Sequence, residues 1–232
     1  MEVGPTCHYV MGGVRVDADT AASTVPGLFA AGECAGGMHG ANRLGGNSLS
    51  DLLVFGKRAG AGAAEYAGGL TSAPAVDYSE VETYVGDMLG HFERDGRENP
   101  YAVQQELQET MQSLVGIIRT QPELEEALGK VRDLKGRAQQ TGVVGNRQYN
   151  PGWHLAMDLR SLLTVSEAIA LAAIDRQESR GAHTRDDYPQ TSPDWAKTTV
   201  VVRMGTDGDT QIAREPLPQM PPELAALLEE KP

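Results

Sequence analysis

Apolar side chains recur every three or four positions through the middle of the chain, which is the spacing of one face of an α-helix. The clearest case is 103–118, and Asn99-Pro100 marks its start because proline suits the first helical turn. Helices are expected over 81–92, 103–118, 123–140 and 152–179. Together they predict a small antiparallel bundle, to whose side chains we assign no catalytic role.

The segments on either side of this helical region follow other patterns. The first 74 residues are rich in glycine, with short strands expected at 8–11 and 28–31. Near the other end, β-branched residues at 198–204, a glycine turn and residues 210–213 predict a β-hairpin, followed by a proline-rich tail with a short docking helix or disorder. These changes predict three parts: 1–74, 75–190 and 191–232.

A loop with three glycines, 38–47, precedes a helix that is expected to begin at Ser48. Ser48 and Asp51 have the spacing of a capping box, in which the two side chains bond to the first amides of the helix. The unpaired amides and the dipole at a helix start also stabilise anions. With Gly45 and Gly46 just before it, a large ligand has room to lie against this helix start.

Four charged or titratable residues in the first part of the chain are candidates for ligand contacts. Arg43 has no acidic residue nearby in sequence, which favours a bidentate contact with a carboxylate or phosphate. His39 either contacts a ligand or fixes the loop by a hydrogen bond, and we favour the second role. Glu33, after an expected strand, is equally suited to binding ribose-like hydroxyls and to capping a turn. For His8, beside a glycine pair, the residues alone favour a structural role.

Composition excludes several classes of function. The charge balance of 20 − 32 = −12 argues against nucleic acid or an anionic membrane as the main partner. The two cysteines, Cys7 and Cys34, do not have metal-ligand spacing, so no metal site is expected, and so few cysteines suit a reducing compartment. No run approaches the ~18 apolar residues of a membrane helix. The abrupt start suggests a fragment of a longer protein.

Three segments taken in order resemble the flavoprotein subunits of succinate dehydrogenase and fumarate reductase. They are PTCHYVMGG, then VPGLFAAGECAGGMHGANRLGGNSLSDLLVFGKRAG, then RQESRGAHTRDDYP, and the likeness covers essentially the whole chain. The resemblance implies an α+β fold class: the distal part of an FAD-binding α/β fold, an antiparallel helical bundle and a small β-hairpin near the carboxyl terminus.

The same resemblance implies roles for individual residues. His8 and Arg43 match the pair that holds the dicarboxylate, succinate or fumarate. Glu33, Ser48 and Leu49 match residues that contact FAD, the last two at a helix start. The run RGAH at 180–183 also matches the family, and we interpret it as a structural return from the bundle to the flavin domain.

Much of the family's site would precede residue 1, including its dinucleotide fingerprint, its flavin-attachment histidine and its proton-transfer arginine. We therefore expect no catalytic residue in this chain and expect the chain alone neither to hold FAD tightly nor to turn over. The intact enzyme would pass electrons through an iron–sulfur subunit to quinone, with indirect contact to a membrane anchor. It would lie at the cytoplasmic face of the bacterial inner membrane.

Two other functions remain open. L-aspartate oxidases share the HGANR loop, but we would expect a cysteine in place of Met11 and a different run after the loop. Alternatively, the fragment acts only as an assembly or binding module, which binding of the iron–sulfur partner by 75–232 without flavin would support.

Overall fold

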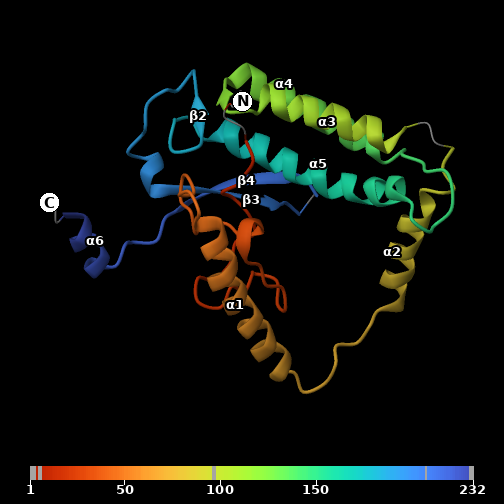
Figure 1. Cartoon of the computed structure of the whole chain (residues 1–232), viewed down its shortest axis with the longest axis horizontal. Helices are drawn as coiled ribbons and strands as arrows, with labels where there is room; N and C mark the ends of the chain where they lie inside the picture. The colour runs from red at the N-terminus through yellow and green to blue at the C-terminus, as the bar shows by residue number, and fades with distance from the viewer. Residues whose placement is uncertain (1–3, 5–6, 96–97, 207, 230–232) are drawn as a thin grey trace. The chain divides into compact units, whose positions relative to one another are not determined.

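The computed structural model describes residues 4, 7–95, 98–206 and 208–229. The chain divides into two compact units, which Figure 1 shows in ribbon form. The first unit consists of Met1–Leu89 and Arg180–His183, and the second consists of Gly90–Ser179 and Thr184–Pro232. Among the described residues, no helix is both long enough and apolar enough to cross a membrane.

The first part of the first unit contains isolated β-bridges. Val14 pairs with Ala35, and Ala22 pairs with Phe29, while Gly32–Cys34 forms a 3-10 turn, η1. The strands expected at 8–11 and 28–31 are therefore not formed as such. A short extended segment forms a stable strand only when successive residues are hydrogen-bonded to a neighbouring strand. The single β-bridges found here do not form such a ladder.

Helix α1 (Asn47–Gly68) starts differently from the prediction. It begins one residue before Ser48, after Gly46, whose φ of 83° is left-handed, and no side chain caps it. The predicted capping box is therefore wrong. Asp51 does not serve its own helix start because its carboxylate is buried against His39.

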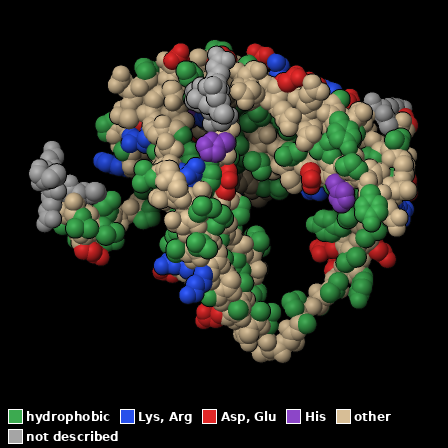
Figure 2. Space-filling view, viewed as in Figure 1, with side chains coloured by type: hydrophobic (Ala, Val, Ile, Leu, Met, Phe, Trp, Pro, Cys, Tyr) green, Lys and Arg blue, Asp and Glu red, His purple; other side chains and the backbone are tan. Residues whose placement is uncertain are grey.

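Helices α1 and α2 (Tyr78–Gly90) expose apolar side chains. Leu49 and Leu53 of α1 are 68% and 76% exposed, and Tyr78 and Tyr84 of α2 are 75% and 63% exposed. Figure 2 shows hydrophobic side chains at the surface along both helices. Such apolar helix faces are typical of surfaces that pack against another part of a protein.

The second unit contains the predicted bundle, built from α3 (Pro100–Leu114), α4 (Gln121–Ala138) and α5 (Pro151–Asp175), which lie side by side in Figure 1. Each helix has a proline in its first turn and a side-chain cap. Asn99 and Asn150 accept hydrogen bonds from the first turns of α3 and α5, and Thr120 forms a capping box with Glu123. These local signals explain why the sequence predicted the bundle.

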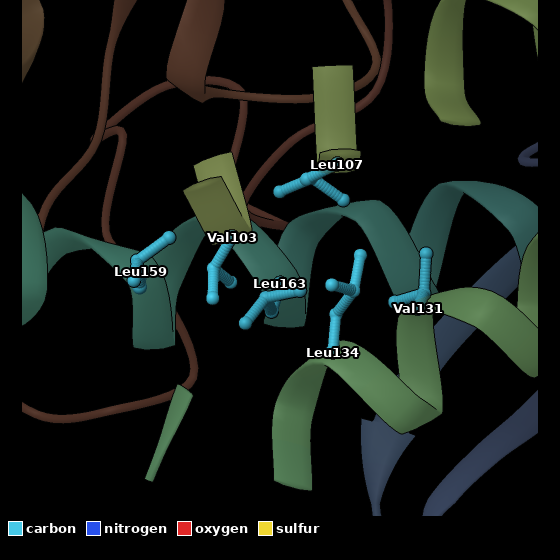
Figure 3. Close-up of a cluster of buried hydrophobic side chains, with 6 residues drawn as sticks. All are labelled: Val103, Leu107, Val131, Leu134, Leu159 and Leu163. Carbon is cyan, nitrogen blue, oxygen red and sulfur yellow. The ribbon is translucent and has the colours of Figure 1, made fainter. Parts of the chain in front are cut away.

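The three helices meet in a cluster of aliphatic side chains (Figure 3). Each helix contributes two of them, and all are at most 4% exposed: Val103, Leu107, Val131, Leu134, Leu159 and Leu163. Burying each such side chain stabilises the fold by roughly 1.5–3 kcal/mol. The bundle is thus held by an ordinary core.

The predicted hairpin is also confirmed. Strands β3 (Thr198–Met204) and β4 (Thr210–Pro216) pair antiparallel with Val201 opposite Ala213, and they pack against α5. Arg214 of β4 makes a two-pronged ion pair with Asp175 at the end of α5. A short helix, α6 (Pro222–Glu229), forms in the tail, and η2 (Trp195–Lys197) precedes the hairpin.

One buried cation joins the ends of the bundle helices. Arg185 lies in β2 (Thr184–Arg185), which pairs in parallel with β1 (Ile118–Arg119), and its side chain is fully buried. It donates hydrogen bonds to the Ala173 carbonyl of α5 at 2.7 Å and to Gln121 of α4 at 2.8 Å. Its Nε and Nη2 atoms each donate to Asp187 at 2.8 Å.

This arrangement predicts a pH-dependent contribution to stability. Hydrogen bonds from Arg185 lower the pKa of Asp187 from 3.8 to about 2. A lowered folded-state pKa adds stability that is present above the unfolded pKa and is lost as pH falls toward 2. Because part of this carboxylate faces water, we expect Asp187→Asn to cost about 1 kcal/mol at neutral pH.

Urea unfolding of Asp187→Asn and wild type between pH 7 and pH 2 measures this difference, which should disappear at the acid end. The neighbouring, exposed Asp186→Asn is the matched control and should leave stability unchanged. A constant difference across the whole pH range would contradict the assignment.

Candidate functional site

His8 and Arg43, 35 positions apart in sequence, lie together in the first unit. Nη2 of Arg43 is 3.4 Å from Nε2 of His8, and Nη1 donates to the carbonyl of Leu44 at 3.2 Å. The guanidinium carbon lies 4.4 Å from the centre of the Tyr9 ring. Nε of Arg43 is buried without a hydrogen-bond partner among the described residues. The structure thus places two predicted site residues side by side.

A buried hydrogen-bonded pair, His39 and Asp51, lies close to Tyr9. Nε2 of His39 is 3.2 Å from Oδ2 of Asp51, and their side chains are only 10% and 2% exposed. The same nitrogen is 3.2 Å from the hydroxyl of Tyr9, whose ring meets the imidazole edge to face. Burying a carboxylate is costly unless it is paired, so Asp51 fixes His39. The loop-fixing role predicted for His39 is confirmed.

The electrostatic surroundings keep Tyr9 neutral. Burial raises the pKa of Tyr9 above its ordinary 10.0, and the negative charges of Asp51 and Glu33 raise it further, while Arg43 opposes them. The phenol therefore stays protonated at neutral pH and presents an uncharged ring to the guanidinium.

The sequence predicted that Glu33 follows a strand. In the structure it instead lies inside the turn η1. Its Oε1 atom accepts a hydrogen bond from the backbone amide of Val10 at 3.0 Å, and the residue is otherwise exposed. The bond joins the chain beside His8 to the turn. A carboxylate that remains open to solvent can also accept bonds from ligand hydroxyls.

The start of α1 suits a large group with a flat apolar ring and an electron-rich edge, such as the flavin of FAD. Unlike the starts of α3, α4 and α5, it has no side-chain cap. A Cβ placed on Gly45 or Gly46 would meet no atom within 4 Å, so the backbone there is open to close approach. Leu44 and Leu49 beside it are 72% and 68% exposed, and Ser48 is partly buried. The residues present fit this cofactor.

The run at 180–183 belongs to the first unit. Ala182 donates its amide to the carbonyl of Ala41 at 3.0 Å, and Arg180 and His183 close a tight turn by exchanging backbone hydrogen bonds of 2.8 and 3.0 Å. The segment therefore packs on the glycine-rich loop. This confirms the structural role predicted for it.

Sequence reasoning missed Tyr9 and Asp51. Tyr9 gave no local signal, since an aromatic next to His8 is ordinary, and Asp51 was interpreted as a helix cap. The separation of 12 positions between His39 and Asp51 matches no local pattern, so only the folded loop brings them together. In the described ranges, no group of three or more His, Cys, Asp or Glu side chains could hold a metal ion.

Comparisons with known proteins agree on one family. A model of the C-terminal part of the fumarate reductase flavoprotein matches residues 104–225, and a model of an FAD binding domain matches residues 1–49. The fumarate reductase flavoprotein of Mycobacterium tuberculosis is 36% identical over 223 residues, which cover 93% of this chain and 38% of the relative.

Two further proteins are similar. The succinate dehydrogenase flavoprotein of Bacillus subtilis is 37% identical over 210 residues, covering 86% of this chain and 35% of the relative. The structure of Mycobacterium smegmatis Sdh1 in complex with UQ1 matches with 53% identity and a TM-score of 0.93, covering 99% of this chain and 39% of that one. The chain thus spans little more than a third of the length of these relatives.

The packing of Gly181 on Ala41 yields a prediction with a matched control. Gly181 and Gly40 have nearly the same left-handed φ, 58° and 55°, but a Cβ at Gly181 would overlap the Ala41 carbonyl, whereas one at Gly40 meets nothing within 4 Å. The backbone penalty alone is roughly 1–2 kcal/mol. Overlap with a fixed carbonyl adds roughly 2 kcal/mol in Gly181→Ala.

Hydrogen exchange of the Ala182 amide reports this contact directly. We expect it to speed up roughly tenfold in Gly40→Ala and roughly a hundredfold or more in Gly181→Ala. Equal effects of the two substitutions would show that the contact with Ala41 does not hold the segment.

Proposed function

The chain belongs to the family of succinate dehydrogenase and fumarate reductase flavoprotein subunits, and from this premise we propose that it forms part of an enzyme that interconverts succinate and fumarate. The observation that carries the proposal is the approach of Arg43 to His8 at 3.4 Å, beside an open helix start. These features put a cation and a hydrogen-bonding imidazole next to a region that fits the cofactor.

Arg43 and His8 would hold the dicarboxylate. A guanidinium presents parallel N–H donors that match the two oxygens of a carboxylate, which fixes the orientation of the substrate as well as its position. Positioning of this kind places the reacting carbon–carbon bond for transfer. The same two residues would polarise a carboxylate and stabilise the negative charge that develops on the substrate.

FAD, when bound, would accept or supply the hydride. Ser48 and Leu49, in the first turn of α1, would then lie against it, with the amides of the helix start stabilising negative charge. Glu33 would accept hydrogen bonds from ribose hydroxyls of the cofactor. The proton-transfer arginine would come from residues outside this chain.

The wider setting of the enzyme follows from the same family. Electrons would pass through an iron–sulfur subunit to quinone, with the membrane anchor contacted only through that partner. The flavoprotein would lie at the cytoplasmic face of the bacterial inner membrane. Support for these partners is the family membership itself and the names of the relatives.

Arg43→Lys in the complete flavoprotein tests the substrate role. An ammonium group cannot make the two-pronged contact, so kcat/KM for the dicarboxylate should fall roughly 10- to 100-fold. Steady-state kinetics with succinate and with fumarate measures this loss. Arg58→Lys, on the exposed surface of α1, is the control and should leave the kinetics unchanged. Unaltered kinetics in Arg43→Lys would remove Arg43 from the site.

The 232-residue chain by itself should show neither turnover nor stoichiometric FAD. Two of its proposed cofactor contacts are open to water, since Leu49 is 68% exposed and Glu33 is exposed as well. Gel filtration of the chain with added FAD, followed by visible absorbance and a succinate-oxidation assay, checks both statements. Flavin-dependent succinate oxidation by the chain alone would refute the proposal that part of the site comes from residues outside this chain.

A further inference from the structure

We propose that Tyr9 is a positioning residue for Arg43, and that the buried pair of His39 and Asp51 holds Tyr9 in place. The inference rests on the proposed function in one respect, namely that Arg43 binds the dicarboxylate. It adds Tyr9, His39 and Asp51 to the residues that support substrate binding. None of the three would itself make a charged contact with the substrate.

A substrate-binding arginine has a particular requirement: it must be held without being neutralised. In this structure, no described carboxylate forms a salt bridge with Arg43. Its neighbours are the carbonyl of Leu44 at 3.2 Å, Nε2 of His8 at 3.4 Å and the face of the Tyr9 ring at 4.4 Å. The face of an aromatic ring attracts a cation through its quadrupole and carries no net charge. Tyr9 can therefore fix the guanidinium while leaving its charge for a ligand.

The ring itself must be fixed, because it follows His8 in a segment without a strand. Nε2 of His39 faces both the Asp51 carboxylate and the Tyr9 hydroxyl at 3.2 Å. A carboxylate only accepts hydrogen bonds, so this nitrogen must carry a hydrogen. That requirement fixes the orientation of the imidazole ring. The Tyr9 ring packs edge to face against the imidazole, with 5.6 Å between the ring centres, so its orientation is fixed as well.

Asp51 ties the assembly to the helix that fits the cofactor. It lies one turn into α1, four residues after Asn47, and its side chain is 2% exposed. A chain of contacts thus runs from the helix start through His39 and Tyr9 to Arg43. The position of the substrate-binding cation is set relative to the same helix that is proposed to face FAD.

The test uses the complete flavoprotein and separates the ring from the hydroxyl. Tyr9→Leu removes the aromatic face and should raise KM for the dicarboxylate roughly three- to tenfold, with little change in bound FAD. Tyr9→Phe keeps the face and should stay within about twofold of wild type. In an Arg43→Lys background, Tyr9→Leu should add less than about twofold, because the planar cation that it positions is gone.

A second series remains informative if Tyr9→Leu does not fold. Phenylalanine at position 9 is replaced by its mono-, di- and trifluorinated analogues, which weaken the quadrupole and leave the ring's shape nearly unchanged. The logarithm of KM should rise stepwise with the number of fluorine atoms. A flat series would overturn the positioning role.

The outcomes distinguish this inference from the proposed function. If Arg43→Lys raises KM but Tyr9→Leu does not, the inference fails and the function stands. If Tyr9→Leu raises KM equally with and without Arg43, Tyr9 acts independently and the inference also fails. An unchanged KM in Arg43→Lys would remove Arg43 from the site, and the inference would fail with it.

Discussion

The arrangement of the candidate site depends on one buried carboxylate, Asp51. A charge removed from water needs a partner, and among the described residues Oδ2 of Asp51 meets His39 in the glycine-rich loop, while Oδ1 has no hydrogen-bond partner. Once that pair forms, the loop has a fixed anchor on α1 in spite of its glycines. The position of Arg43, four residues beyond His39, follows from this anchor and from the Tyr9 ring.

The two units differ in how far their side chains are buried and paired. The second unit buries an aliphatic core, caps its helices and pairs a deeply buried arginine, Arg185, with a carboxylate, a carbonyl and an amide. The first unit instead leaves Leu49, Leu53 and much of α2 open. The chain spans little more than a third of the length of these relatives.

Local chemistry explains which features could be predicted from the sequence. The bundle and the hairpin rest on periodic apolar positions, prolines in first turns, asparagine caps and a glycine turn, all of which act over a few residues. The glycine-rich first part has no such period, so its expected strands were wrong. The approach of His8 to Arg43 was accessible only through the family resemblance, and the burial of Asp51 was hidden behind a plausible capping pattern.

The absence of a described carboxylate beside Arg43 also bears on how the protein meets ordinary solutions. If Arg43 binds the dicarboxylate as proposed, a guanidinium that rests on an aromatic ring instead of a described carboxylate is open to small anions from the medium before the substrate arrives. Chloride, sulfate or phosphate would then compete with a dicarboxylate for one place. The affinity measured for the dicarboxylate would therefore depend on which buffer salt is used and at what concentration.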